Sequence, residues 1–205
     1  MKLFNTNHLL KYFFVFSFFL LRGYAIAGNE PKKPQAEILQ ELKSKSVLDI
    51  LRIANSYSYK DLNLSLACAN VALEKAKLET DKRNLFDVQR AIGFIYEDNT
   101  MVQKAIETYE NTIKIAEILG DTALSTLYND LAIVSRKNGN YRAAYNYYDK
   151  TIFHAKLIRD SLMEESSYHG LGQLHKEVGI YDKAIENYLL SLALSEKSKD
   201  RKSVV

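Results

Sequence analysis

One pattern returns along the chain at an interval near forty residues, and it restricts the fold more than any other feature of the sequence. Residues 139–152 read GNYRAAYNYYDKTI and residues 179–192 read GIYDKAIENYLLSL, so Gly, Tyr, Ala and a second Tyr return at the same offsets. Self-similarity at a fixed period of about 20–50 residues is typical of proteins that stack copies of one supersecondary unit. The sequence therefore predicts a repetitive stack.

The residues that make up each repeat are those of α-helices. No proline follows Pro34, and Ala, Leu, Glu, Lys and Tyr recur at spacings of three and four residues. Small side chains let two helices approach to about 8 Å, and an aromatic ring fills the space where the helices diverge. Each unit is therefore predicted to be an antiparallel helix pair. The columns that predict this packing are Ser65, Ala105, Ala144 and Ala184; Ala69, Tyr109, Tyr148 and Tyr188; and Gly93, Ala132 and Gly172.

Two kinds of residue mark the ends of the predicted helices. Gly139 and Gly179 lie where the first helix of a pair should end, because glycine readily adopts the positive φ of a helix C-terminus. The second unit has Thr100 at this position. Aspartates recur between the units, where their side chains can cap the first helix of the next pair. These candidate caps are Asp81, Asp121, Asp160 and Asp200.

The repeats resemble the tetratricopeptide repeat family over about residues 47–199. The resemblance is carried by DLAIVSRKNGNYRAAYNYYDKTI and GLGQLHKEVGIYDKAIENYLLSL, by AIGFIYEDNTMVQKAIETYENTI, and more weakly by LNLSLACANVALEKA. The 39–40-residue interval exceeds the family's usual value of about 34, the chain has no Trp, and no proline closes a unit. The resemblance implies an all-α fold, a right-handed α-solenoid of stacked antiparallel helix pairs that binds a protein or peptide ligand.

The N-terminus has the pattern of a secretory signal peptide. Lys2 and Lys11 precede an apolar run over residues 12–21, and Ala25-Ile26-Ala27 has the small residues of a cleavage site. The run is about half as long as a membrane-spanning helix, so cleavage after Ala27 and export are expected, to the periplasm in a Gram-negative cell. The predicted organisation is a signal peptide at 1–27, a flexible lead at 28–36, about four repeat units at 37–199 and the start of a further repeat at 200–205.

Composition argues against several functional classes. Of 28 basic residues, three lie in the first 27, so the remaining chain carries 25 basic and 25 acidic residues. This balance gives no general attraction to nucleic acid. Cys68 is the single cysteine, which excludes an intramolecular disulfide and a cysteine-based metal cluster, and we expect it to be buried. The chain after the signal peptide has no further apolar run that could span a membrane.

No catalytic residue, cofactor-binding residue or metal ligand is predicted. His169 and His175 are six residues apart on a predicted helix and should point to different faces, so they cannot share a metal as an i, i+4 pair would. An enzyme with an unrecognised site is retained as the least favoured class, and these two histidines are its main support.

The predicted binding surface is the concave groove that, in the related family, is lined by the first helix of each pair. Side chains at spacings of three and four on these helices, away from the core columns, are mixed polar with an occasional apolar residue, which suits peptide recognition. They are Asp87, Arg90, Phe94 and Glu97; Thr126, Asn129, Ile133 and Arg136; and Ser166, His169, Gln173 and Lys176.

Two functions fit these observations. The favoured one is an exported, non-enzymatic interaction module that forms the extracytoplasmic sensory or scaffold part of a larger bacterial signalling protein. The alternative is a stand-alone exported adaptor for envelope or secretion machinery, in which the last helix is covered by self-association. The identity of the ligand is open in both.

Overall fold

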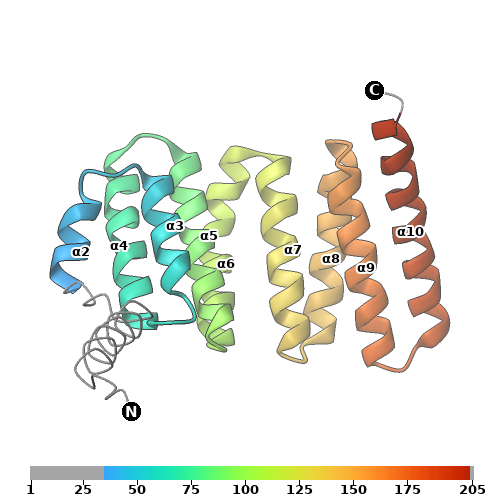
Figure 1. Ribbon diagram of the computed structural model, residues 1–205. Helices are drawn as coiled ribbons and strands as arrows, with labels where there is room; N and C mark the ends of the chain where they lie inside the picture. The colour runs from blue at the N-terminus through green and yellow to red at the C-terminus, as the bar shows by residue number, and fades with distance from the viewer. Residues whose placement is uncertain (1–34, 204–205) are drawn as a thin grey trace, which may run out of the picture. The chain divides into compact units, whose positions relative to one another are not determined.

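The computed structural model describes residues 35–203, and in this range every regular element is an α-helix (Figure 1). The residues after Ile38 form one compact unit, and the account below concerns this unit. The helices are α2 (Gln35–Leu42), α3 (Val47–Tyr57), α4 (Leu62–Leu78), α5 (Lys82–Asp98), α6 (Val102–Leu119), α7 (Asp121–Lys137), α8 (Tyr141–Leu157), α9 (Ser161–Glu177) and α10 (Tyr181–Ser203).

Consecutive helices pack as four pairs, α3 with α4, α5 with α6, α7 with α8 and α9 with α10. Figure 1 shows them side by side along the stack, each running opposite to the helix before it. This is the predicted all-α solenoid of antiparallel helix pairs. The short connections within the pairs, such as residues 99–101, leave no room for any other arrangement of neighbours.

The small and aromatic columns form the core of the stack, as predicted. Tyr109 and Tyr148 are fully buried, and so are the small residues Ala105 and Ala144 one turn before them. A Cβ atom added at Gly93 would lie only 2.2 Å from Cε1 of the Tyr109 ring. The first helix of the pair can therefore approach the tyrosine of the second only because this column carries the smallest side chains.

The turns inside the last three pairs each place one residue in the left-handed region of φ. Gly139 and Gly179 have φ values of 74° and 80°, as their predicted role at a helix end requires. Thr100 adopts the same conformation at 59°, although a β-branched residue is strained there. The second unit thus keeps the turn that its sequence appeared to lack.

Two of the four predicted aspartate caps form. Asp81 accepts a hydrogen bond from the Arg83 N–H, and Asp160 accepts from the N–H groups of Leu162 and Met163. Asp121 is instead the first residue of α7, because Gly120, with φ at 89°, serves both as the end of α6 and as the cap of α7.

The fourth candidate cap, Asp200, lies within α10, which continues to Ser203. The new unit predicted at 200–205 therefore does not begin at Asp200, because no glycine, proline or left-handed residue interrupts the helix between Tyr181 and that position. The predicted lead at 28–36 differs in its last two residues, since Gln35 and Ala36 open α2. The signal peptide and residues 28–34 lie outside the described residues.

Cys68 is buried in α4 and unpaired, as expected of a small apolar side chain, and burial raises the pKa of its thiol. None of the helices between residues 35 and 203 combines the length and the apolar character that crossing a membrane requires.

Candidate functional site

The first helices of the second, third and fourth pairs, α5, α7 and α9, carry the predicted binding residues. We call the surface formed by these residues the first-helix wall; its members are Asp87, Arg90, Phe94, Glu97, Thr126, Asn129, Ile133, Arg136, Ser166, His169, Gln173 and Lys176. Ser166, His169 and Lys176 on α9 are exposed, whereas the nine other residues are half-buried. The wall is thus most open at its α9 end.

Ion pairs between residues about forty positions apart tie each first helix to the next. The Arg90 guanidinium on α5 binds the Asp130 carboxylate on α7 through two of its nitrogens, one of them Nη2 at 3.3 Å from Oδ1. Lys137 Nζ on α7 lies 2.6 Å from Glu97 Oε1 on α5. Between α7 and α9, Arg136 pairs with Glu177. The wall is therefore continuous from α5 to α9.

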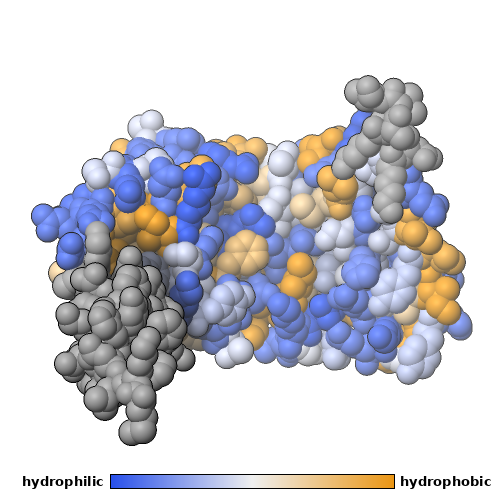
Figure 2. Space-filling view, viewed as in Figure 1, coloured by the Kyte–Doolittle hydropathy of each residue, from blue (hydrophilic) through white to orange (hydrophobic). Residues whose placement is uncertain are grey.

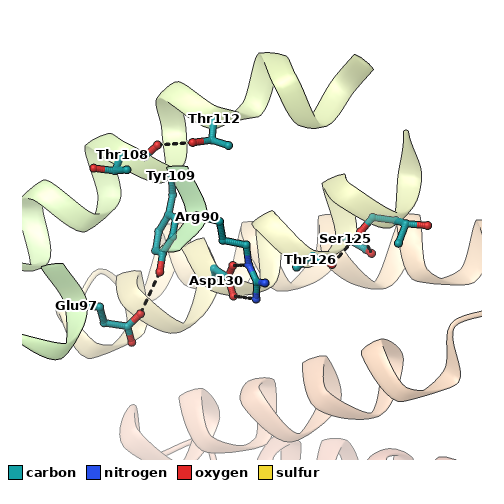
Figure 3. Close-up of polar contacts among 9 residues, drawn as sticks. Arg90, Glu97, Thr108, Tyr109, Thr112, Ser125, Thr126 and Asp130 are labelled. Atoms are coloured by element: carbon teal, nitrogen blue, oxygen red, sulfur yellow. Dashed lines mark hydrogen bonds and ion pairs between the residues drawn. The ribbon is translucent and has the colours of Figure 1, made fainter. Parts of the chain in front are cut away.

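Figure 3 shows the Arg90–Asp130 pair, whose carboxylate is the least exposed of the three ion pairs. Asp130 is buried, and this burial raises the pKa of its carboxyl to about 6 against the opposing pull of the Arg90 guanidinium. Tyr109, which donates to Glu97 Oε2 at 3.4 Å, is buried beside the pair, and burial raises the pKa of its phenol. The Arg90 guanidinium also lies 4.7 Å from the centre of the Phe94 ring, a cation–π contact.

Several wall residues are thus occupied in joining helices. Arg90, Glu97 and Arg136 each hold a partner on a neighbouring first helix. Asp87 pairs with Arg83 within α5 at 3.3 Å. All four were predicted from the sequence to contact a ligand. Their exposed atoms lie on the wall, but some of their charged groups are already paired within the protein.

The rest of the wall is mixed in character. Gln173 Nε2 and His169 Nε2 lie 3.0 Å apart, and the His169 ring lies 5.5 Å from that of Tyr188. Ile133 packs against the core cluster that contains Tyr148. The side-chain oxygen of Asn129 is buried without a hydrogen-bond partner. This mixture offers hydrogen bonds and small apolar contacts.

Sequence reasoning missed the partners Asp130, Lys137 and Glu177. Each one follows an oppositely charged residue by 40 or 41 positions, as the three separations Arg90–Asp130, Glu97–Lys137 and Arg136–Glu177 show. Opposite charges at the repeat interval were therefore the signal that would have identified these contacts.

The two histidines considered as a catalytic or metal pair are separated by their surroundings. His169 is exposed on the wall, whereas His175 is buried, with its Nδ1 atom 3.3 Å from Asn187 Nδ2. Burial and the nearby Lys183 lower the pKa of His175. Over residues 35–203, no three His, Cys, Asp or Glu side chains gather in a way that could hold a metal ion.

Comparison with solved structures relates the fold to several proteins of low sequence identity. Aspartyl phosphate phosphatase F from Bacillus subtilis is 20% identical with a TM-score of 0.68, over 75% of this chain and 41% of that protein. BtubC from P. vanneervenii is 19% identical with a TM-score of 0.64, over 81% of this chain and 75% of that protein. MamA is 18% identical with a TM-score of 0.58, over 81% of this chain and 87% of that protein.

These likenesses concern the fold, and the chain spans less than half the length of the Bacillus phosphatase. No curated protein matches the sequence. The family model of the tetratricopeptide repeat matches residues 122–197, which contain most of the last two helix pairs, α7 to α10. Residues 122–197 therefore carry tetratricopeptide repeats, the kind of repeat from which protein–protein interaction modules are built.

Proposed function

We propose that this protein is exported and that it holds an extended or helical segment of a partner protein against the first-helix wall. The observation that carries the proposal is the set of ion pairs between successive first helices, Arg90–Asp130, Glu97–Lys137 and Arg136–Glu177. They keep α5, α7 and α9 in a fixed register, and a wall held in this way loses little conformational freedom when a partner binds.

The side chains of the wall suit a polypeptide ligand. His169, Gln173 and Lys176 can hydrogen-bond to a peptide backbone or to polar side chains, while Phe94 and Ile133 add apolar contact. Acidic and basic groups are interspersed, which does not favour an extended polyanion such as nucleic acid. A peptide segment with both polar and apolar side chains fits this surface best.

The wall assignment is tested by charge substitution at its exposed end. The variant Ser166→Glu/His169→Glu/Lys176→Glu changes three exposed residues of α9 and should reduce the amount of partner that co-purifies with the protein at least about tenfold. The matched control Asn111→Glu/Lys114→Glu changes exposed residues on α6, a second helix, and should leave co-purification unchanged. Equal loss in both variants would contradict a ligand on the wall.

The proposed location is outside the cytoplasm, with the repeats as the sensory front of a larger signalling protein. The support for export is the charged, apolar and small-residue pattern of residues 1–27. The intact mass of the native product, immunoprecipitated from fractionated cells, tests both statements. A membrane-bound product much larger than the given chain supports the signalling role. A small soluble product that begins at Gly28 favours the stand-alone adaptor, and a cytoplasmic product that retains Met1 contradicts export.

A further inference from the structure

The last helix pair exposes large apolar side chains over the outer side of α10 and the turn before it. We call this surface the α10 patch; its members are Val178, Ile180, Tyr181, Ile185, Leu189, Leu190 and Leu192, each at least 38% exposed. Figure 2 shows apolar surface along the outer edge of α10. Contiguous apolar surface of this kind on a protein marks a site of interaction.

Repeat alignment shows that the end of a stack accounts for only part of the patch. Val178, Ile180, Leu189 and Leu190 occupy the positions that Asn138, Asn140, Asp149 and Lys150 hold one unit earlier. All four earlier residues are exposed even though α9 and α10 follow them. A further repeat stacked on α10 would therefore leave these positions in solvent, so their apolar side chains require a different cover.

Only part of the patch matches positions that a following repeat would cover. Leu192 corresponds to Ile152, which is buried, and Ile185 corresponds to Tyr145, which is exposed even with a following unit in place. The other apolar residues of the patch extend around α10 to positions that, one unit earlier, are not covered by the following helix pair. The occupant must therefore contact a side of the stack on which α8 exposes the polar Asp149 and Lys150 next to the apolar Phe153 and Leu157.

We propose that the α10 patch is the interface of a homodimer, in which the α10 helices of two copies pack antiparallel across a two-fold axis. Tyr181, Ile185, Leu189 and Leu192 recur at intervals of four, four and three residues and form a stripe along one side of the helix. In a two-fold pair the same stripe faces itself, so a stripe with this spacing is complementary to its own copy.

The size and charge of the patch agree with a second copy as the occupant. Without Leu190, which points away from the stripe, six large side chains that each expose on the order of 100 Å² give a patch on the order of 600 Å², at the lower end of the roughly 600–1,000 Å² per partner of a stable interface. The charged residues beside the stripe are Asp182, Lys183 and Glu186, which are mixed in sign and exposed. Such a border creates no strong repulsion between copies. Basic residues gather further along α10, at Lys197, Lys199, Arg201 and Lys202, and binding to an anionic lipid surface is therefore one outcome of the test.

The test is the molar mass of the purified native protein, measured by light scattering over about 1–100 µM, a range suited to interfaces of this size. The variant Leu189→Asp/Leu190→Lys gives α10 the residues that α8 carries at the same positions, and it should weaken the dimer at least about 100-fold. Because Asp149 and Lys150 are compatible with the fold in α8, the variant should keep its helical circular dichroism and its cooperative unfolding.

Leu157→Asp is the matched control, because Leu157 is an equally exposed leucine on α8 outside the patch. Wild type and this control should have twice the mass of one chain, and the double variant should have the mass of one chain. A monomeric wild type over the whole range overturns the proposal, as does a double variant that stays dimeric. A monomeric wild type that co-sediments with phosphatidylglycerol–phosphatidylethanolamine vesicles would assign the patch to lipid instead and equally overturn it.

Discussion

The Arg90 guanidinium on α5 is paired with the buried Asp130 carboxylate on α7, forty residues later in the chain. Removing one partner of a buried pair leaves an uncompensated charge, so Arg90→Met should lower the free energy of unfolding at pH 8 by about 3 kcal/mol. Replacing both residues, as in Arg90→Met/Asp130→Leu, should restore most of this loss. Denaturant unfolding of the two variants checks the account, and a double variant less stable than Arg90→Met would contradict it.

The same carboxyl should make the stability of the protein depend on pH. Burial raises the pKa of Asp130 to about 6 in the folded protein, whereas an unfolded Asp has a pKa of about 3.9. The folded state therefore binds this proton more tightly. Its stabilising effect is complete below pH ~4 and is lost as the pH rises through 6, a change of about 3 kcal/mol. Asp130→Asn should remove this contribution, which unfolding curves between pH 4 and 7 will show; an identical pH dependence in wild type and variant would contradict it.

Gly93 gives the first helix of the second pair room to pass the Tyr109 ring. A methyl group at this position would lie 2.2 Å from the ring, so Gly93→Ala should destabilise the fold by about 1–3 kcal/mol despite its higher helix propensity. Thermal unfolding measures the effect. Gly93→Ala should cost much less in a Tyr109→Leu background, where the ring is gone; an equal cost in both backgrounds would show that the ring is not the obstacle.

The two buried tyrosines of the core column differ in their hydroxyl groups. The Tyr109 hydroxyl donates to Glu97, whereas the Tyr148 hydroxyl lies close to the Arg136 guanidinium without a hydrogen bond of regular geometry. Tyr148→Phe should therefore leave stability unchanged or raise it, while Tyr109→Phe should lower it by about 0.5–1.5 kcal/mol. Tyr148→Ala, which removes the ring, should cost about 3–5 kcal/mol. Equilibrium unfolding ranks the three variants, and a Tyr148→Phe loss as large as that of Tyr109→Phe would show that the Tyr148 hydroxyl is bonded.

Thr100 provides a test of backbone strain. Its φ of 59° matches the left-handed turns at Gly139 and Gly179, and a β-branched residue adopts this conformation at a cost of about 1–3 kcal/mol. Thr100→Gly should therefore raise the free energy of unfolding by about 1 kcal/mol, after the greater entropy of glycine in the unfolded chain is deducted. A lower stability in Thr100→Gly would show that the threonine is not strained.

The sequence predicted the packing of the stack because small and aromatic residues recur at fixed positions. Gly93 and Tyr109 are in contact, as expected where a column of small residues meets a column of aromatic residues. Thr100 was harder to interpret, because its positive φ is imposed by the helices on either side and not by its own preference. Asp200 was wrongly expected to start a new unit. An aspartate caps a helix only where the preceding helix has ended, and Asp200 lies inside the continuous helix α10.

The bonding of the candidate residues was not predictable from one helix alone. Periodicity placed Arg90 and Glu97 away from the core columns of α5, and both are half-buried. Periodicity within one helix cannot show that each is paired with the next helix, at Asp130 and Lys137. That information lies in the comparison of residues one repeat apart, where opposite charges face each other across the stack.

The most direct test of the central claim, that the first-helix wall holds the partner, is photo-crosslinking in living cells. A photoreactive side chain at Ser166 or His169 would stand on the exposed end of the wall, and one at Asn111 or Lys114 would stand on α6. The account predicts one distinct crosslinked product from both wall positions and none from the two α6 positions. Crosslinks to the same product from α6, with none from the wall, would contradict it.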